Sequence, residues 1–145
     1  MFREIRLAAL KEAPYAFGST YQREVEADEL NWRSRLAGRA QFVAELLDGS
    51  AAGTAGGIPS GDGSASLISV WVRPESRGTG AGDSLVEAVL EWARAGRFPA
   101  VRLWVTTGND AAERLYVRHG FVRTGAVKPV IEGEDRTELE MIRVL

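Results

Sequence analysis

The sequence lacks cysteine altogether and contains a single histidine, His119, among its 145 residues. The absence of cysteine excludes disulfides, thiol nucleophiles and cysteine-ligated zinc. With one histidine, neither a histidine-based metal cluster nor a Ser-His-Asp triad is expected, so we predict no metal. No apolar run approaches the roughly 18 residues of a membrane-spanning helix, and no charged-then-apolar signal segment opens the chain.

The chain also lacks an excess of either charge, because 18 Lys and Arg residues are matched by 20 Asp and Glu residues, for a formal net charge of −2. A balance this close provides no basic field for nucleic acid. Hydrophobic residues make up 45% and charged residues 26% of the sequence, as in ordinary globular proteins. We therefore predict one domain over residues 1–145, located in the cytoplasm, with neither nucleic acid nor a membrane as partner.

Hydrophobic periodicity predicts a mixture of helices and strands. Helical spacing is found in residues 2–12, before Pro14, and more loosely in the stretch that ends at Gly38. Further helices are predicted over residues 83–96 and 109–120, and strands over residues 41–47, 53–58, 66–72, 100–107, 121–130 and 136–145. This order indicates a mixed sheet with helices on its faces. Trp71 and Trp104 lie on the expected central strands, so we predict that both are core residues.

Residues 72–82, VRPESRGTGAG, place Gly78, Gly80 and Gly82 between a predicted strand and a predicted helix. The first turn of a helix has unsatisfied N–H groups and a partial positive charge, and glycine lets a diphosphate approach the backbone closely. A plain glycine-rich connector is the alternative. Two familiar nucleotide loops do not fit, because the dinucleotide fingerprint needs glycine where Asp83 stands, and a P-loop needs a lysine that is absent here.

Two segments carry a resemblance to a known family. VRPESRGTGAG matches Arg/Gln-x-x-Gly-x-Gly/Ala through Arg77, Gly80 and Gly82, and NDAAERLYVRHGF, residues 109–121, matches Asn-x-x-Ala-x-x-Leu-Tyr-x-x-x-Gly-Phe. In these motifs the sequence resembles the GNAT family of acetyl-CoA-dependent N-acetyltransferases. The resemblance covers essentially the whole chain. The resemblance implies an α+β fold of three α/β/α layers, whose mixed, mostly antiparallel sheet contains a parallel, splayed central strand pair. Because the first predicted helix begins almost at Phe2, we predict that the family's first edge strand is missing.

The resemblance also implies how acetyl-CoA is bound. Backbone N–H groups of the glycine loop would hold the diphosphate, while backbone groups of the preceding strand and the Asn109 side chain would bond the pantetheine arm. The implied cofactor-binding residues are Val70, Trp71, Val72, Arg77, Gly78, Thr79, Gly80, Ala81, Gly82, Asp83, Asn109 and Tyr116. Arg73 is a weaker candidate for a phosphate neighbour, and lining of the acceptor channel is the alternative role for Trp71.

Two of these positions, Asp83 and Asn109, have a second interpretation, and the nearby His119 needs one of its own. Asp83 stands where relatives often carry Arg, Lys or a neutral residue; its carboxylate suits the helix dipole but repels a diphosphate, so we predict weaker CoA affinity than in a typical relative. Asn109 is also a candidate N-cap, worth about 1 kcal/mol, and the two roles are compatible. His119 is interpreted as structural, because an imidazole beside a helix C-terminus is favourable without any chemistry.

Two residues are candidates for catalysis. The motif places Tyr116 beside the CoA sulfur as a proton donor, with core packing as the alternative. The attacking amine must lose a proton, and relatives often carry glutamate on the strand where this chain has Ser66 and Ser69. We predict Glu24 as the base, with a water relay as the alternative; Glu24 lies in an acidic cluster whose default interpretation is a solvated helix face.

The implied function is that of an acyltransferase, which moves an acetyl group from acetyl-CoA to a primary amine of a small molecule or peptide by direct attack in a ternary complex. A catalytically weak GNAT module that binds CoA as a sensor or interaction subunit is the alternative, and a phosphate-binding regulatory domain is a third.

An unpaired, partly apolar sheet edge at residues 41–47 favours strand addition from a second chain, so we predict a homodimer.

Overall fold

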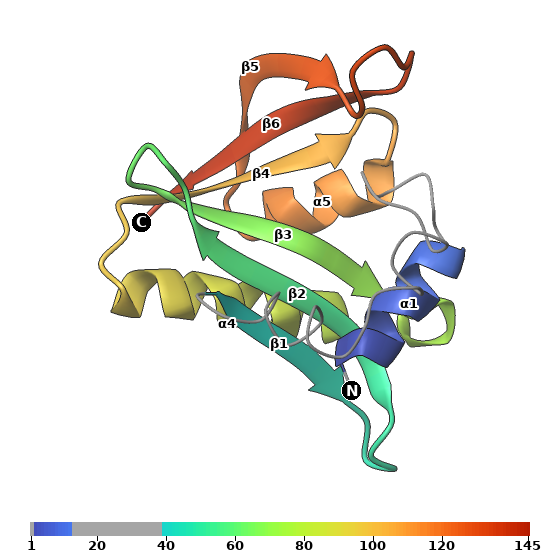
Figure 1. The fold of residues 1–145 in the computed structure, drawn as a ribbon. Helices are drawn as coiled ribbons and strands as arrows, with labels where there is room; N and C mark the ends of the chain where they lie inside the picture. The colour runs from blue at the N-terminus through green and yellow to red at the C-terminus, as the bar shows by residue number, and fades with distance from the viewer. Residues whose placement is uncertain (1, 13–38) are drawn as a thin grey trace.

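The computed structural model describes residues 2–12 and 39–145 (Figure 1). Within these described ranges, six strands form one sheet in the order β1-β2-β3-β4-β6-β5. The strands are β1 (Ala40–Glu45), β2 (Ala51–Pro59), β3 (Ala65–Val72), β4 (Ala100–Thr106), β5 (Val122–Pro129) and β6 (Thr137–Val144). The helices are α1 (Phe2–Glu12), α4 (Ala81–Ala95), α5 (Asp110–Arg118) and the short 3-10 turn η2 (Pro74–Ser76). The predicted mixed sheet with helices is confirmed, while the helix predicted before Gly38 lies outside the described residues.

The central strand pair diverges. β3 and β4 run parallel and share only two paired positions, Ala65 with Val101 and Ser66 with Arg102, whereas the other neighbouring strands are antiparallel. Within β3, the ladder to β2 is interrupted near Ser69, whose φ of +55° is unusual for a residue other than glycine. The splayed parallel pair expected from the family resemblance is therefore confirmed.

Two clusters of buried side chains lie on opposite faces of the sheet. The first joins the apolar side of α4 to α5 and the inner strands. The second joins α1 to Trp71 and Ala51. Successive residues of β1 divide between them, since Phe42 and Ala44 pack against the first cluster and Val43 against the second. Neighbouring strand residues point to opposite faces, so α4 and α5 cover one face and α1 covers part of the other.

β2 is longer and more buried than expected. The small residues of AAGTAGG suggest only a weak strand over residues 53–58, yet the strand spans Ala51–Pro59 and its first seven residues are buried. A Cβ on Gly57 would lie 2.6 Å from the ring of Trp92 on α4. The small side chains of β2 therefore let α4 pack close to the sheet, which is why low β-propensity did not prevent strand formation.

The prediction that Trp104 is a core residue is wrong. Trp104 remains 36% exposed, whereas Trp71 is only 6% exposed, as predicted. Trp104 lies on the face of β4 opposite to its neighbours Leu103 and Val105, which pack in the first core cluster. There the Nζ atom of Lys128 lies 4.1 Å from the centre of the Trp104 ring, so a cation–π contact replaces apolar cover.

β1 forms one end of the sheet and pairs with β2. Among the residues that the structure describes, the first element is α1, which begins at Phe2, as the helical spacing of residues 2–12 predicted. Within the same residues, no helix is long and apolar enough to cross a bilayer. Nor does the described part of the chain bring three or more His, Asp or Glu side chains together in a group suited to a metal ion.

Candidate active site

The segment between β3 and α4 is shaped by glycines. Gly78 and Gly80 adopt φ values of +77° and +91°, a region that side chains other than glycine rarely occupy. Gly80 is the N-cap residue of α4, and no side chain caps this helix. The N–H groups of the first turn of α4 are therefore left available to an anion, and the helix dipole favours such a ligand.

A pocket of about 530 Å³ opens beside this segment. Its walls come from the end of β3, the glycine segment, the first turn of α4 and the inner face of α5. The lining residues are Val70, Trp71, Val72, Arg77, Gly78, Gly80, Gly82, Asp83, Asn109, Ala111, Ala112, Leu115, Tyr116 and Arg118. The pocket thus occupies the region where β3 and β4 have stopped pairing.

The structure brings most of the predicted site residues together around this pocket. Of the twelve predicted cofactor-binding residues, only Thr79 and Ala81 are not among the lining residues, although both belong to the same loop and helix start. Arg73 bonds instead to the carbonyl of Ala51 through Nε, at 2.6 Å. Glu24 lies outside the described residues. The binding roles of the residues around the pocket stay predictions.

Asn109 is the N-cap of α5, as one of its two interpretations predicted. Its Oδ1 accepts a hydrogen bond from the Ala112 N–H at 3.3 Å. This contact uses only the side-chain oxygen, so the amide nitrogen at the pocket wall is the part of Asn109 suited to donate to a ligand.

Tyr116 lines the pocket from α5 and is only 7% exposed. Its ring packs edge-on against Phe121, with 5.9 Å between ring centres. Burial raises the pKa of the Tyr116 phenol well above its usual value, because the phenolate would be poorly solvated. Tyr116 is therefore both a core residue and a protonated hydroxyl at the pocket, and these two interpretations are compatible.

Comparison with known proteins identifies the fold. Residues 4–121 match the model of the Acetyltransferase (GNAT) family. The chain belongs to the GNAT family. As a member of this family it is an acyl-CoA-dependent N-acetyltransferase. No curated protein matches this GNAT chain.

Solved structures resemble this GNAT protein over much of its length. Nourseothricin acetyltransferase shares 29% identity and a TM-score of 0.67, over 74% of this chain and 66% of its own. Ard1 from Thermoplasma volcanium shares 27% identity and a TM-score of 0.71, over 82% and 80%. yncA from Salmonella typhimurium, whose structure includes its cofactor acetyl-CoA, shares 22% identity and a TM-score of 0.75, over 99% and 86%, and this level shows the fold alone.

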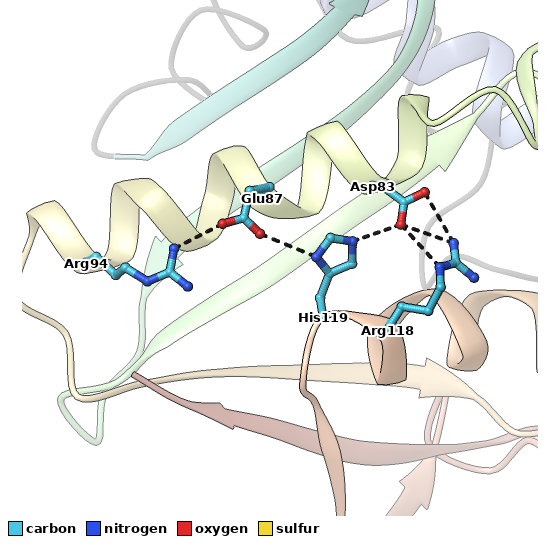
Figure 2. Close-up of polar contacts among 5 residues, drawn as sticks. All are labelled: Asp83, Glu87, Arg94, Arg118 and His119. Atoms are coloured by element: carbon cyan, nitrogen blue, oxygen red, sulfur yellow. Dashed lines mark hydrogen bonds and ion pairs between the residues drawn. The ribbon is translucent and has the colours of Figure 1, made fainter.

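In this GNAT pocket the charge of Asp83 is compensated from α5 (Figure 2). Nε2 of His119 lies 2.9 Å and Nη2 of Arg118 lies 3.2 Å from Oδ1 of Asp83. The hydrogen bond to His119, followed by that to Arg118, lowers the pKa of the Asp83 carboxyl. The other ring nitrogen of His119 lies 3.4 Å from Glu87, one helical turn further along α4. The Arg118 cation reduces the repulsion on which our prediction of weaker CoA affinity rests, and that prediction remains untested.

Sequence reasoning missed four lining residues of the pocket, all on α5. Ala112 and Leu115 match the family motif but are not among the predicted cofactor-binding residues, and neither are Ala111 and Arg118. The helical spacing of Ala112, Leu115 and Tyr116 was the available signal, since residues three and four apart share a face. Nothing in the sequence pointed to Arg118, because its carboxylate partner lies 35 residues away.

Proposed function

We propose that this pocket binds acetyl-CoA with its diphosphate on the N-terminal turn of α4 and its pantetheine arm along β3. The observation that carries the proposal is that one pocket contains both the diverging end of β3 and the start of α4, which has no side-chain cap. The chemistry of the donor set fits, because backbone N–H groups suit a diphosphate and the unpaired edge of a strand suits pantetheine amides.

We propose direct transfer in a ternary complex. A primary amine attacks the thioester carbonyl only when neutral, and keeping a lysine-like amine deprotonated near pH 7 costs on the order of 4–5 kcal/mol. A C–N bond then forms, the C–S bond breaks, and CoA leaves as a thiolate. Tyr116 is our candidate donor of a hydrogen bond or proton to that sulfur. Glu24, outside the described residues, stays our prediction for the group that receives the proton of the amine.

We propose a small molecule with a primary amine as the acceptor, with a peptide amine as the alternative. The similarity to nourseothricin acetyltransferase, at 29% identity, supports an acceptor of this class. The test is a panel of nourseothricin, a linear diamine and a peptide with a free N-terminus, each mixed with acetyl-CoA and the protein. We expect at least one amine to accelerate release of free CoA thiol and to gain one acetyl group in its mass spectrum.

A catalytically weak module that binds acetyl-CoA is the second candidate. Ser66 and Ser69 on β3 favour it, because neither supplies a carboxylate there; the hydroxyl of Ser66 bonds to that of Ser60, and Ser69 has the strained backbone of the ladder interruption. The amine panel distinguishes the two candidates. Tight binding of acetyl-CoA without amine-dependent thiol release from any acceptor class would favour the sensor, and release would exclude it.

We further propose a homodimer that uses the β1 edge. β1 ends the strand order, and in the part of the chain that the structure describes only its β2 side is paired. An edge strand with free N–H and C=O groups favours pairing with a second copy. Sedimentation equilibrium should therefore give twice the mass of 15.8 kDa at micromolar concentration. Replacing Val43 of β1 with Pro should shift the protein toward the monomer, because proline removes a ladder donor, whereas a parent that is already monomeric would contradict the dimer.

We also infer a cytoplasmic location, because the acetyl-CoA that the reaction consumes is abundant in that compartment.

A further inference from the structure

Glu12, the last residue of α1, accepts hydrogen bonds from two side chains that line the pocket. Its Oε2 lies 2.9 Å from Nε1 of Trp71 and 3.0 Å from Nη2 of Arg77. Nε of Arg77 in turn donates to the carbonyl of Val72 at 2.9 Å. Figure 1 shows α1 beside the arrowhead of β3. One carboxylate of the N-terminal helix thus connects the end of β3 to the start of the glycine segment.

These contacts fix the two pocket side chains in different ways. Arg77 is exposed, and a free arginine side chain samples many rotamers that a ligand must order at a cost in free energy. Two acceptors on separate elements already hold its guanidinium in one orientation beside Gly78. Trp71 is buried, so its indole N–H needs a partner within the protein, and Glu12 is that partner.

We propose that Glu12 is a positioning residue for acetyl-CoA, which preorganises Arg77 and the end of β3 before the donor binds. The proposal rests on the function proposed above, since it assumes that this pocket is the donor site. Glu12 is not among the lining residues, so it acts through Trp71 and Arg77 rather than by touching the donor.

The charge of Glu12 alone would act in the opposite direction. A carboxylate next to the guanidinium of Arg77 offsets part of the positive charge that would attract a diphosphate. If charge dominated, removing the carboxylate would tighten acetyl-CoA binding. If positioning dominates, removing both hydrogen bonds weakens binding, and a neutral acceptor of the same shape largely restores it.

Titration calorimetry with acetyl-CoA alone tests this without a known acceptor. We expect Glu12→Ala to raise the Kd about three- to tenfold, since the ion pair is partly exposed and its effect is limited. Glu12→Gln should stay within about twofold of the parent, because its amide oxygen can accept the same hydrogen bonds. Combining Glu12→Ala with Arg77→Ala should raise the Kd by less than the product of the two single effects, because both variants lose the same contact between Glu12 and Arg77.

Glu75→Ala is the matched control, because it removes an exposed carboxylate from η2, in the same segment, and should leave the Kd unchanged. If Glu12→Ala does not fold, Glu12→Asp, which shortens the side chain by one methylene, should raise the Kd in the same direction. An unchanged Kd in a folded Glu12→Ala or Glu12→Asp variant, or a lower Kd in both Glu12→Ala and Glu12→Gln, overturns the proposal. A parent protein that does not bind acetyl-CoA at all overturns the donor site itself.

Discussion

Replacing Tyr116 with Phe is expected to lower kcat about ten- to a hundredfold while the Kd for acetyl-CoA stays within about twofold. The phenol is buried at the pocket wall, and its raised pKa keeps it protonated at every working pH. A protonated phenol can offer a hydrogen bond to the leaving sulfur, while the same raised pKa makes it a weaker acid than an ordinary tyrosine. General-acid assistance is typically worth 10²–10⁴-fold, and a thiolate is a good leaving group, so the effect should fall at or below the lower end of this range.

Phe is the informative replacement because it preserves the edge-on contact with Phe121 and removes only the hydroxyl. Steady-state rates with an acceptor from the amine panel, together with titration calorimetry for acetyl-CoA, separate turnover from binding. Val117→Ala, at an exposed position on the same helix, should leave both quantities unchanged. A Tyr116→Phe variant with the parent kcat would show that Tyr116 serves packing alone.

Replacing Gly80 with Val is expected to weaken acetyl-CoA binding at least tenfold. The N-cap position of α4 has a φ of +91°, and no atom lies within 4 Å of the place where a Cβ would stand. The new side chain would therefore occupy the pocket beside the first turn of the helix, where we place the diphosphate, and the β-branched residue would also strain the turn. A loss of about 1.4 kcal/mol of contact is enough for the tenfold change.

Gly63 provides a matched control for this substitution. It lies in the β2–β3 turn with a φ of +89° and, like Gly80, has nothing within 4 Å of a Cβ position. Gly63→Val should impose a similar backbone strain, and so a similar loss of thermal stability, without changing the Kd for acetyl-CoA. If Gly80→Val folds and binds acetyl-CoA as the parent does, or if both variants lose affinity equally, the diphosphate does not lie where we place it.

The site could be predicted from the sequence where its signals are local. Pro74 ends a strand, Gly80 begins a helix with a backbone that only glycine adopts readily, and Asn109 caps a helix; each of these depends on a few neighbouring residues. Together they predicted the strand, the loop and both helices that line the pocket. The family motifs then supplied the order in which these elements meet.

Contacts between distant residues could not be predicted in the same way. Glu12 and Trp71 are 59 residues apart, and Asp83 and Arg118 are 35 apart, so no periodicity links them. The mistake at Trp104 has a related cause: an aromatic residue on a central strand is buried only if another element covers its face, and α4 and α5 cover the other one. Burial of this kind depends on tertiary packing rather than on the strand itself.

The two paired positions between β3 and β4 also limit how cooperatively the protein can unfold. Among the residues that the structure describes, they are the only strand pairing between a half made of β1, β2 and β3 and a half made of β4, β6 and β5. The ends of β3 and β4 should therefore open locally at a lower free energy than the rest of the sheet, and their amide hydrogens should exchange early. Acetyl-CoA bound between the two strands would contact both halves. Its binding should therefore slow amide hydrogen exchange in β2 and β6 as well as in the residues that it touches.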